Sequence, residues 1–89
     1  METVKIFWKL DCPKCSSAKR LGGILKEEGV EVIGYNLDTV DGLAEGAYYS
    51  VMATPTMIVE DSDENFIADF RGIVPTPEEI RRQICQYFQ

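Results

Sequence analysis

The chain has no histidine among its 89 residues, so it lacks the usual general base and the commonest metal ligand of proteins. No apolar run approaches the roughly 18 to 20 residues that a membrane-spanning helix needs. The first residues lead directly into a strand-like segment, without a signal-like region. Repeats, linkers and low-complexity tracts are absent as well. We therefore expect a soluble, cytoplasmic protein with no membrane partner.

Basic side chains are few and gather at one end of the chain. Residues 1–20 carry five basic and two acidic side chains, whereas the remainder carries four basic and thirteen acidic ones, for a net charge of −6. A nucleic-acid partner requires cations clustered on a binding face, so none is expected. With 45% hydrophobic residues, the chain can bury one small core, and we expect a single domain over residues 1–89.

Cysteine is also scarce, but two of the three cysteines are close together. Cys12 and Cys15 lie where an apolar strand-like run, residues 4–10, is followed by a stretch with helical periodicity from residue 13 to about 28. Pro13 suits a first helical turn because it has no N–H to lose, which places Cys12 at the helix cap. Because Cys15 follows Cys12 by three residues, the two lie on the same face of the predicted helix. We expect a redox pair in which Cys12 is the attacking thiol and Cys15 the resolving one.

Two lysines are expected to tune this pair. Lys9 and Lys14, together with the helix dipole, favour the thiolate form of Cys12, whereas Asp11 opposes them. The alternative is half of a structural zinc site, but zinc needs four ligands and only Cys85 remains, so no metal is expected. Cys85 itself is expected to pack in the core, with a regulatory thiol as the alternative.

The rest of the chain continues the alternation of strands and helices. The predicted segments are a strand over 30–37, a helix from 41 to about 52, strands over 56–60 and 66–70, and a helix from Thr76-Pro77 onwards. The first strand, helix and second strand form a βαβ unit with parallel strands. A polar turn joins the last two strands as an antiparallel hairpin. The fold class is α/β, in the order β-α-β-α-β-β-α.

Three local patterns leave alternatives open. The pair Gly22-Gly23 either weakens its helix or marks the close approach of another segment. Most of Tyr48, Tyr49 and Met52 should be core, although one could line a shallow substrate groove. The acidic turn over 61–64 lacks the glycine and the terminal glutamate of a calcium loop, so we expect a solvated turn.

The cysteine motif Cys12-Pro13-Lys14-Cys15 and the segment over 49–56, which ends in Thr54-Pro55-Thr56, occur in register. Through these two motifs, essentially the whole chain resembles the thioredoxin/glutaredoxin superfamily. The resemblance implies a thioredoxin-like fold, a four-stranded mixed sheet flanked by three helices, with a cis bond before Pro55. It also implies a thiol-disulfide oxidoreductase that reduces a disulfide-containing protein through a mixed disulfide, with the Thr54 backbone and Pro55 beside the thiols to dock the substrate.

The resemblance is divided between the two branches of the superfamily. Lys9 matches a lysine that is common in glutaredoxins, but Lys14 stands where they have an aromatic residue, and their glutathione signature is absent around residues 70–73. Ile6 and Asp11 stand where thioredoxins often have a buried acid and a tryptophan. The implied electron donor is therefore either glutathione or an upstream reductase. No other cofactor is expected, and the chain should be a monomer.

Two other functional classes remain as alternatives. In the first, Cys12 and Cys15 bind an iron–sulfur cluster or a metal across a dimer, although Pro13 disfavours opening the motif. In the second, the chain is a non-catalytic interaction domain, but such domains commonly lose one of the two thiols, and both are present here.

Overall fold

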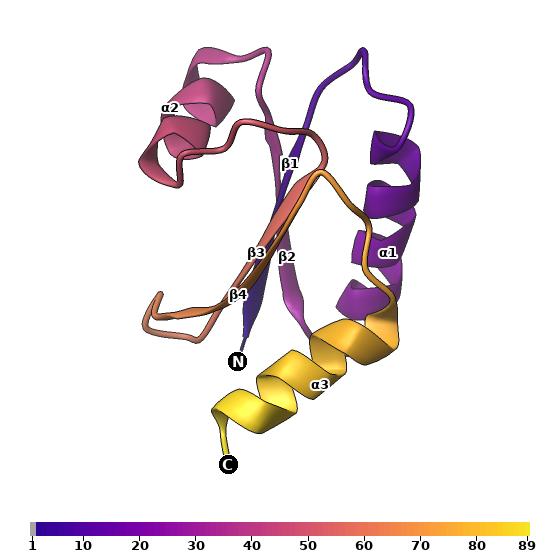
Figure 1. The fold of residues 1–89 in the computed structure, drawn as a ribbon, viewed down its shortest axis with the longest axis vertical. Helices are drawn as coiled ribbons and strands as arrows, with labels where there is room; N and C mark the ends of the chain where they lie inside the picture. The colour runs from indigo at the N-terminus through magenta and orange to yellow at the C-terminus, as the bar shows by residue number, and fades with distance from the viewer. Residues whose placement is uncertain (1) are drawn as a thin grey trace.

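The protein is described by a computed structural model that covers residues 2–89, so only Met1 of the expected domain lies outside the described residues. Figure 1 shows seven elements that follow the predicted order. They are β1 (Thr3–Trp8), α1 (Cys15–Glu27), β2 (Glu31–Asn36), α2 (Val40–Tyr48), β3 (Thr56–Glu60), β4 (Phe66–Arg71) and α3 (Pro77–Tyr87). The predicted α/β fold is confirmed. Within these residues, no helix combines the length and apolar character needed to span a bilayer.

The four strands form one mixed sheet in the order β2-β1-β3-β4. Strand β1 is parallel to β2 and antiparallel to β3, and β3 and β4 form the predicted hairpin. Because β1 is a central strand, the loop that leaves its carboxyl end at Trp8 starts in the middle of the sheet. This loop carries Cys12, and the segment before β3 approaches the same end of the sheet.

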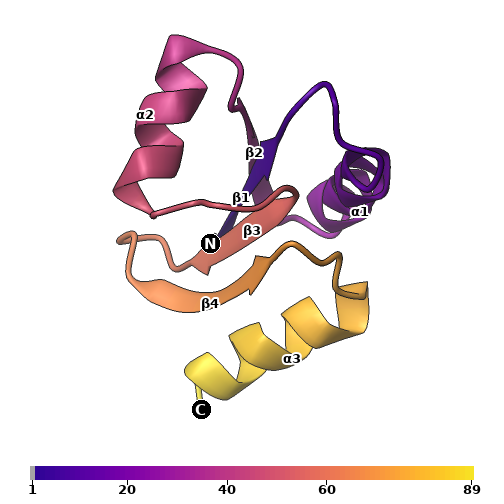
Figure 2. The same cartoon turned by 45° about the horizontal axis from the view of Figure 1, so that its top comes forward.

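Helices α1 and α3 cover one face of the sheet, and α2 covers the other (Figures 1 and 2). The main core lies under α1 and α3, where Val4 and Ile6 of β1 belong to one cluster with buried side chains of both helices. Met57 and Val59 of β3 complete this layer and are fully buried. Burial of these apolar side chains is the main force that holds the helices on the sheet.

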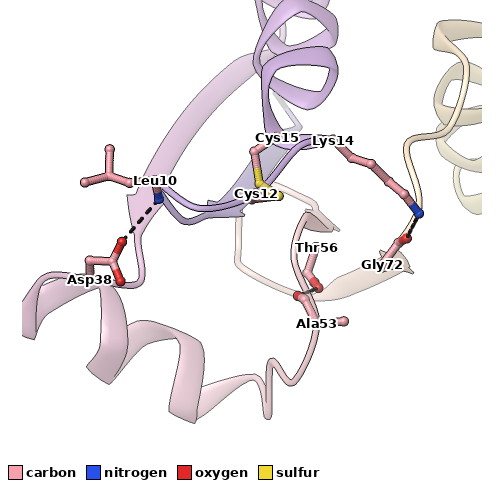
Figure 3. The surroundings of a disulfide bond; sticks show 8 residues. All are labelled: Leu10, Cys12, Lys14, Cys15, Asp38, Ala53, Thr56 and Gly72. Carbon is pink, nitrogen blue, oxygen red and sulfur yellow. Dashed lines mark hydrogen bonds between the residues drawn. A yellow bond between two sulfur atoms is a disulfide. The ribbon is translucent and has the colours of Figure 1, made fainter.

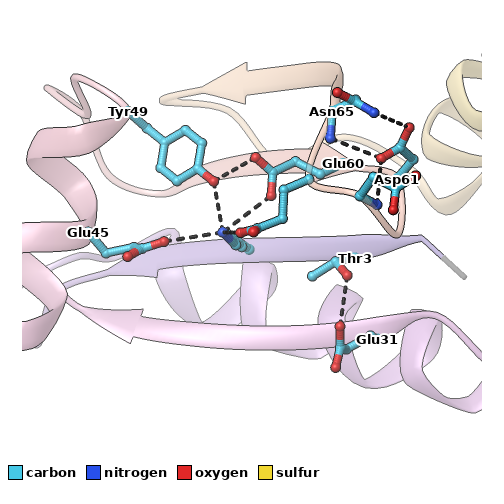
Figure 4. A network of polar contacts seen from close by, with 10 residues as sticks. Thr3, Glu31, Glu45, Tyr49, Glu60, Asp61 and Asn65 are labelled. Carbon is cyan, nitrogen blue, oxygen red and sulfur yellow. Dashed lines mark hydrogen bonds and ion pairs between the residues drawn. The ribbon is translucent and has the colours of Figure 1, made fainter.

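The face under α2 contains a buried polar cluster that the sequence pattern does not predict (Figure 4). Lys5 of β1, only 5% exposed, donates hydrogen bonds to the Tyr49 hydroxyl at 2.7 Å and to the Glu45 carboxylate at 3.2 Å. Its ammonium also lies 3.2 Å from the buried Glu60 carboxylate, which accepts a hydrogen bond from Tyr49 at 2.6 Å. Burial lowers the pKa of Lys5, but these hydrogen bonds outweigh it and raise the pKa above its usual value.

The glycine pair of α1 is explained by close packing against the sheet. A Cβ atom on Gly22 would lie 2.8 Å from the side chain of Ile6, whereas one on Gly23 would meet nothing within 4 Å. Gly22 therefore lets α1 approach β1 closely, and Gly23 faces away from the sheet. A closer approach occurs at Gly42 of α2, where a Cβ would lie 1.9 Å from the carbonyl oxygen of Asn36.

The predicted start of α3 is confirmed, but the end of α2 differs from the prediction. Thr76 and Glu79 form a capping box at the start of α3. Helix α2 ends at Tyr48 rather than near Met52, because Ser50 adopts a positive φ of 55° that is incompatible with a continuing helix. Residues after Ser50 are therefore in a loop.

Three side chains expected in the core are exposed instead. Tyr48 is 79% exposed and Met52 93%, the latter because it follows the end of α2. Cys85 is also exposed, since α3 turns Ile80 and Ile84 toward the core. The expectation that Cys85 packs in the core was wrong. The acidic turn after β3 closes on itself, with Asp61 accepting hydrogen bonds from the N–H groups of Asp63 and Asn65.

Candidate active site

The two cysteines of the motif are joined in a disulfide at the entrance to α1 (Figure 3). Their sulfur atoms are 2.17 Å apart, and their Cα atoms 5.4 Å. Cys15 is only 3% exposed, whereas Cys12 is half-buried. Cys12 is thus the more accessible of the two residues to a molecule that approaches from solvent.

The start of α1 lies two residues later than predicted. Lys14, rather than Cys12, is the residue at the cap, and Cys15 is the first helical residue. The reason is a separate turn in which the Cys15 N–H donates to the Cys12 carbonyl at 3.2 Å, before the first helical bond from Ala18 to Lys14. Pro13 lies within this turn and not in the helix. The N–H groups of the first helical turn remain without helical acceptors next to the disulfide.

A chain of polar contacts links the cysteine motif to the segment around Pro55. The Lys14 ammonium donates to the Gly72 carbonyl oxygen at 3.4 Å, as Figure 3 shows. The Gly72 N–H in turn donates to the Pro55 carbonyl oxygen at 2.8 Å. Gly72 follows β4 and has a φ of 75°, a conformation that glycine adopts readily. Two motifs about 40 residues apart in the chain therefore meet at Gly72.

The peptide bond between Thr54 and Pro55 is cis, as expected. On either side of it, the Thr56 hydroxyl donates to the Ala53 carbonyl oxygen at 2.6 Å and closes a tight turn. Within the described residues, neither the N–H nor the carbonyl oxygen of Thr54 has a hydrogen-bond partner in the chain. The Thr54 backbone is therefore available to a partner in an extended conformation.

A cleft of about 500 Å³ lies next to Thr54, between α2 and the loops that follow β1 and β2. Lys9 and Asp38 contribute charged side chains to it, and the exposed Met52 and Leu43 contribute apolar ones. Met52 thus belongs to a groove, which was the minority interpretation of the sequence. Lys9 and Lys14 lie in different parts of the site, because Lys9 lines this cleft whereas Lys14 contacts Gly72.

Several residues of this region are not singled out by the sequence. Asp38 holds the loop that carries the cysteines, because its carboxylate accepts a hydrogen bond from the Leu10 N–H at 3.2 Å. In the sequence, Gly72 can be recognised only as a glycine that directly follows a predicted strand, and nothing there indicates its contact with Lys14. Within residues 2–89, no group of three or more His, Cys, Asp or Glu side chains is arranged to hold a metal ion.

Comparisons with solved structures agree with this architecture. A malarial protein of known structure superposes with a TM-score of 0.82 at 16% identity, covering 100% of this chain and 99% of the other. Thioredoxin 1 of Thermosipho africanus gives a TM-score of 0.76 at 20% identity, covering 97% and 93% of the two chains. Fasciola hepatica thioredoxin gives 0.76 at 24% identity, covering 96% and 79%. These similarities show a shared fold.

Sequence comparisons identify the family. Residues 2–84 match the family described as Thioredoxin domain. A protein of Archaeoglobus fulgidus named "Probable Thioredoxin" is 31% identical over 62 residues, which is 68% of each chain. The family match spans the cysteine pair that the structure places at the start of α1. The chain therefore belongs to the thioredoxin family and is, at that general level, a thiol-disulfide oxidoreductase that acts on disulfide-containing substrates.

Proposed function

We propose that this protein reduces disulfides in other proteins through the Cys12–Cys15 pair. In the reduced protein, the Cys12 thiolate attacks one sulfur of the substrate disulfide, which breaks that bond and releases the other substrate sulfur as a thiolate. The Cys15 thiolate then attacks the Cys12 sulfur, which releases the second substrate sulfur and forms the Cys12–Cys15 disulfide. Two electrons pass from the pair to the substrate, whose two thiolates take up two protons.

The difference in exposure between Cys12 and Cys15 carries this proposal. A half-buried Cys12 can be reached by a substrate disulfide, whereas the nearly buried Cys15 can reach only the sulfur to which it is already close. The nearby cations and the unpaired N–H groups of the first turn of α1 favour the thiolate that starts the reaction. This arrangement supports Cys12 as nucleophile and Cys15 as resolving thiol.

The neighbouring backbone supports a polypeptide as substrate. An extended substrate segment would pair with the free N–H and carbonyl oxygen of Thr54, in the manner of strand addition. One of its side chains would enter the adjacent cleft, where Met52 and Leu43 offer apolar contact and Lys9 offers a positive charge. Pro55 contributes no N–H of its own to this segment, so Thr54 supplies the pairing groups.

We further propose that the protein works as a monomer without a bound cofactor and is reduced again by an upstream reductase or by glutathione. Lys9 supports the glutathione route, because its ammonium lies in a cleft that is large enough for a small peptide. The two donors are separated by supplying each to the oxidised protein and following the appearance of free thiols.

An equilibrium redox titration in glutathione and dithiothreitol buffers tests the proposal, read as the mass shift on alkylation, with metal content measured on the same sample. A reversible two-electron couple at about −270 to −200 mV, the range of dithiol reductants, would support it. Cys15→Ser should accumulate a mixed disulfide with a substrate protein, and Cys12→Ser should not. Absence of a couple, or thiols protected by bound metal, would contradict the proposal in favour of a metal or iron–sulfur carrier.

A further inference from the structure

Arg71, the last residue of β4, makes an unusual set of contacts with the end of α2. Its guanidinium donates to the Tyr49 carbonyl oxygen at 3.0 Å and to the Ser50 carbonyl oxygen at 3.1 Å. A third N–H of the same group donates to the Asp69 carboxylate at 2.7 Å. A planar guanidinium can make all of these bonds at once, because its donors form a rigid fork.

The two carbonyl groups that accept from Arg71 belong to the two residues that directly follow helix α2, which ends at Tyr48. The carboxyl end of a helix carries the negative end of the helix dipole. A positive charge placed there stabilises the helix end. Arg71 also binds the chain at the point where it leaves the helical conformation, because Ser50 has a φ of 55°.

The neighbouring Gly72 holds the other end of the same segment. Its N–H donates to the Pro55 carbonyl oxygen at 2.8 Å, and a Cβ on Gly72 would already lie 3.4 Å from the Cβ of Ala53. Arg71 itself is aligned with Thr56 in the register of β3 and β4. Arg71 and Gly72 are consecutive residues at the end of β4, and together they bind residues 49–55 at both ends. Thr54 lies between these two points of contact.

We propose that Arg71 is a positioning residue for substrate docking: by holding the carbonyl groups of Tyr49 and Ser50, it sets the position of the Thr54 backbone that pairs with a polypeptide substrate. The inference rests on the proposed function, because it assigns to one side chain the placement of the docking segment. The hydrogen bonds of the Arg71 side chain go to Asp69 and to the Tyr49 and Ser50 carbonyl groups, and not to the cysteines. The effect of Arg71 should therefore be confined to substrates that use the Thr54 backbone.

The test compares two disulfides of different size on pre-reduced protein in single-turnover reactions, quenched by alkylation. One is a peptide with an intramolecular disulfide, and the other is hydroxyethyl disulfide, which has no backbone to pair with Thr54. The variants are Arg71→Gln, which removes the fork, and Arg71→Lys, which keeps the charge but not the fork. Arg82→Gln, an exposed position on α3, removes the same charge elsewhere and serves as the matched control.

Arg71→Gln should raise the half-saturating concentration of the peptide about fivefold or more, with its limiting rate changed less than about twofold. The rate with hydroxyethyl disulfide and the reduction potential should stay unchanged, as should every reading for Arg82→Gln. Arg71→Lys should recover only part of the peptide binding. If Arg71→Gln does not fold, Asp69→Ala, which removes the acceptor of one guanidinium N–H, should give a smaller increase of the same kind.

Unchanged peptide saturation in the Arg71 variants would overturn the inference and leave the proposed function intact. A parallel loss with both disulfides, accompanied by a lower melting temperature, would overturn it as well, because it would show a purely stabilising role. A wild-type protein that reduces neither disulfide would refute the proposed function, and with it the role of Arg71.

Discussion

The Lys14 ammonium lies 3.4 Å from the carbonyl oxygen of Gly72. Lys14 lies between the two cysteines in the sequence, and Gly72 is hydrogen-bonded to Pro55. The contact therefore positions the Lys14 ammonium between the cysteine motif and the segment around Pro55. A lysine that is fixed in this way can favour a negative charge on the neighbouring Cys12 in the reduced protein.

Replacing Lys14 by glutamate should slow the reaction of the reduced protein with disulfides at neutral pH, by about threefold to tenfold at low salt. The reason is that a negative charge at this position disfavours the Cys12 thiolate and loses the contact with Gly72. The difference should shrink as salt is added, because exposed charges are screened. Lys26→Glu, in the last turn of the same helix, makes the same charge change far from the cysteines and should leave the rate unchanged. An equal slowing in both variants would contradict a local effect of Lys14.

The cleft beside Thr54 can be tested by filling it. Ala47 lines the cleft, whereas the exposed Ala44 of the same helix does not, so Ala47→Trp and Ala44→Trp form a matched pair. Ala47→Trp should raise the half-saturating concentration of a peptide disulfide about fivefold or more, because a large side chain would occupy the space of a substrate side chain. Ala44→Trp should not. Identical saturation curves for the two variants would show that the substrate does not enter the cleft.

The buried pair of Lys5 and Glu60 predicts a strongly non-additive effect on stability. Lys5→Met should lower the free energy of unfolding by about 3 to 5 kcal/mol, because it leaves the Glu60 carboxylate buried without its cation. Adding Glu60→Gln should restore part of that loss, since the second change removes the uncompensated charge. Denaturant unfolding of the two single variants and the double variant measures this coupling. Additive losses would mean that the two groups do not stabilise each other.

Tyr49, in the same cluster, predicts a loss of stability in alkaline solution. Burial, followed by the hydrogen bond to Glu60, raises the pKa of Tyr49 from 10.0 to about 12. Between these values the unfolded chain loses the tyrosine proton and the folded chain keeps it, so stability should fall as the pH rises from about 10 to about 12. Tyr49→Phe should have a shallower pH dependence in this window, measured as the midpoint of urea unfolding at each pH. Parallel curves for the two proteins would contradict a role for Tyr49.

The glycine pair of α1 predicts opposite outcomes at adjacent positions. Gly23→Ala should raise the free energy of unfolding by up to about 1 kcal/mol, because alanine is the better helix former and its Cβ would meet no neighbour. Gly22→Ala should give no such gain, because its Cβ would lie 2.8 Å from Ile6. Thermal unfolding of the two variants is sufficient to compare them. Stabilisation by both changes would show that α1 can move away from β1 at no cost.

The order of the elements was predictable because each has its own local pattern. Strand β3 occupies the predicted residues 56–60, and the capping threonine of α3 is where its sequence places it. The start of α1 was not predictable from Pro13, since proline suits a turn as well as a first helical residue. The hydrogen bond from the Cys15 N–H to the Cys12 carbonyl shows that Pro13 lies in a turn and not in the helix.

Within the candidate site, the sequence indicated the groups with distinctive chemistry but not those that act through backbone atoms. Cys12, Cys15 and Pro55 stand out by residue type and spacing. Arg71 and Gly72 do not stand out, because both act on backbone groups: the Arg71 guanidinium binds carbonyl oxygens, and Gly72 contributes its own N–H. Carbonyl and N–H groups are present at almost every position of any chain. Lys5 resembles an ordinary solvent-facing interruption of a strand until its partners on α2 and β3 are known.

The sequence by itself determined the alternation of strands and helices and the pairing of Cys12 with Cys15, because periodicity and short spacing are local properties of a chain. Only the tertiary structure decided which carbonyl groups Arg71 holds, that Lys14 contacts Gly72, and that Lys5 is buried among carboxylates. These contacts join residues between 20 and 60 positions apart in the chain. They exist because the sheet brings those segments together, and no local pattern in the sequence indicates which distant segments will meet.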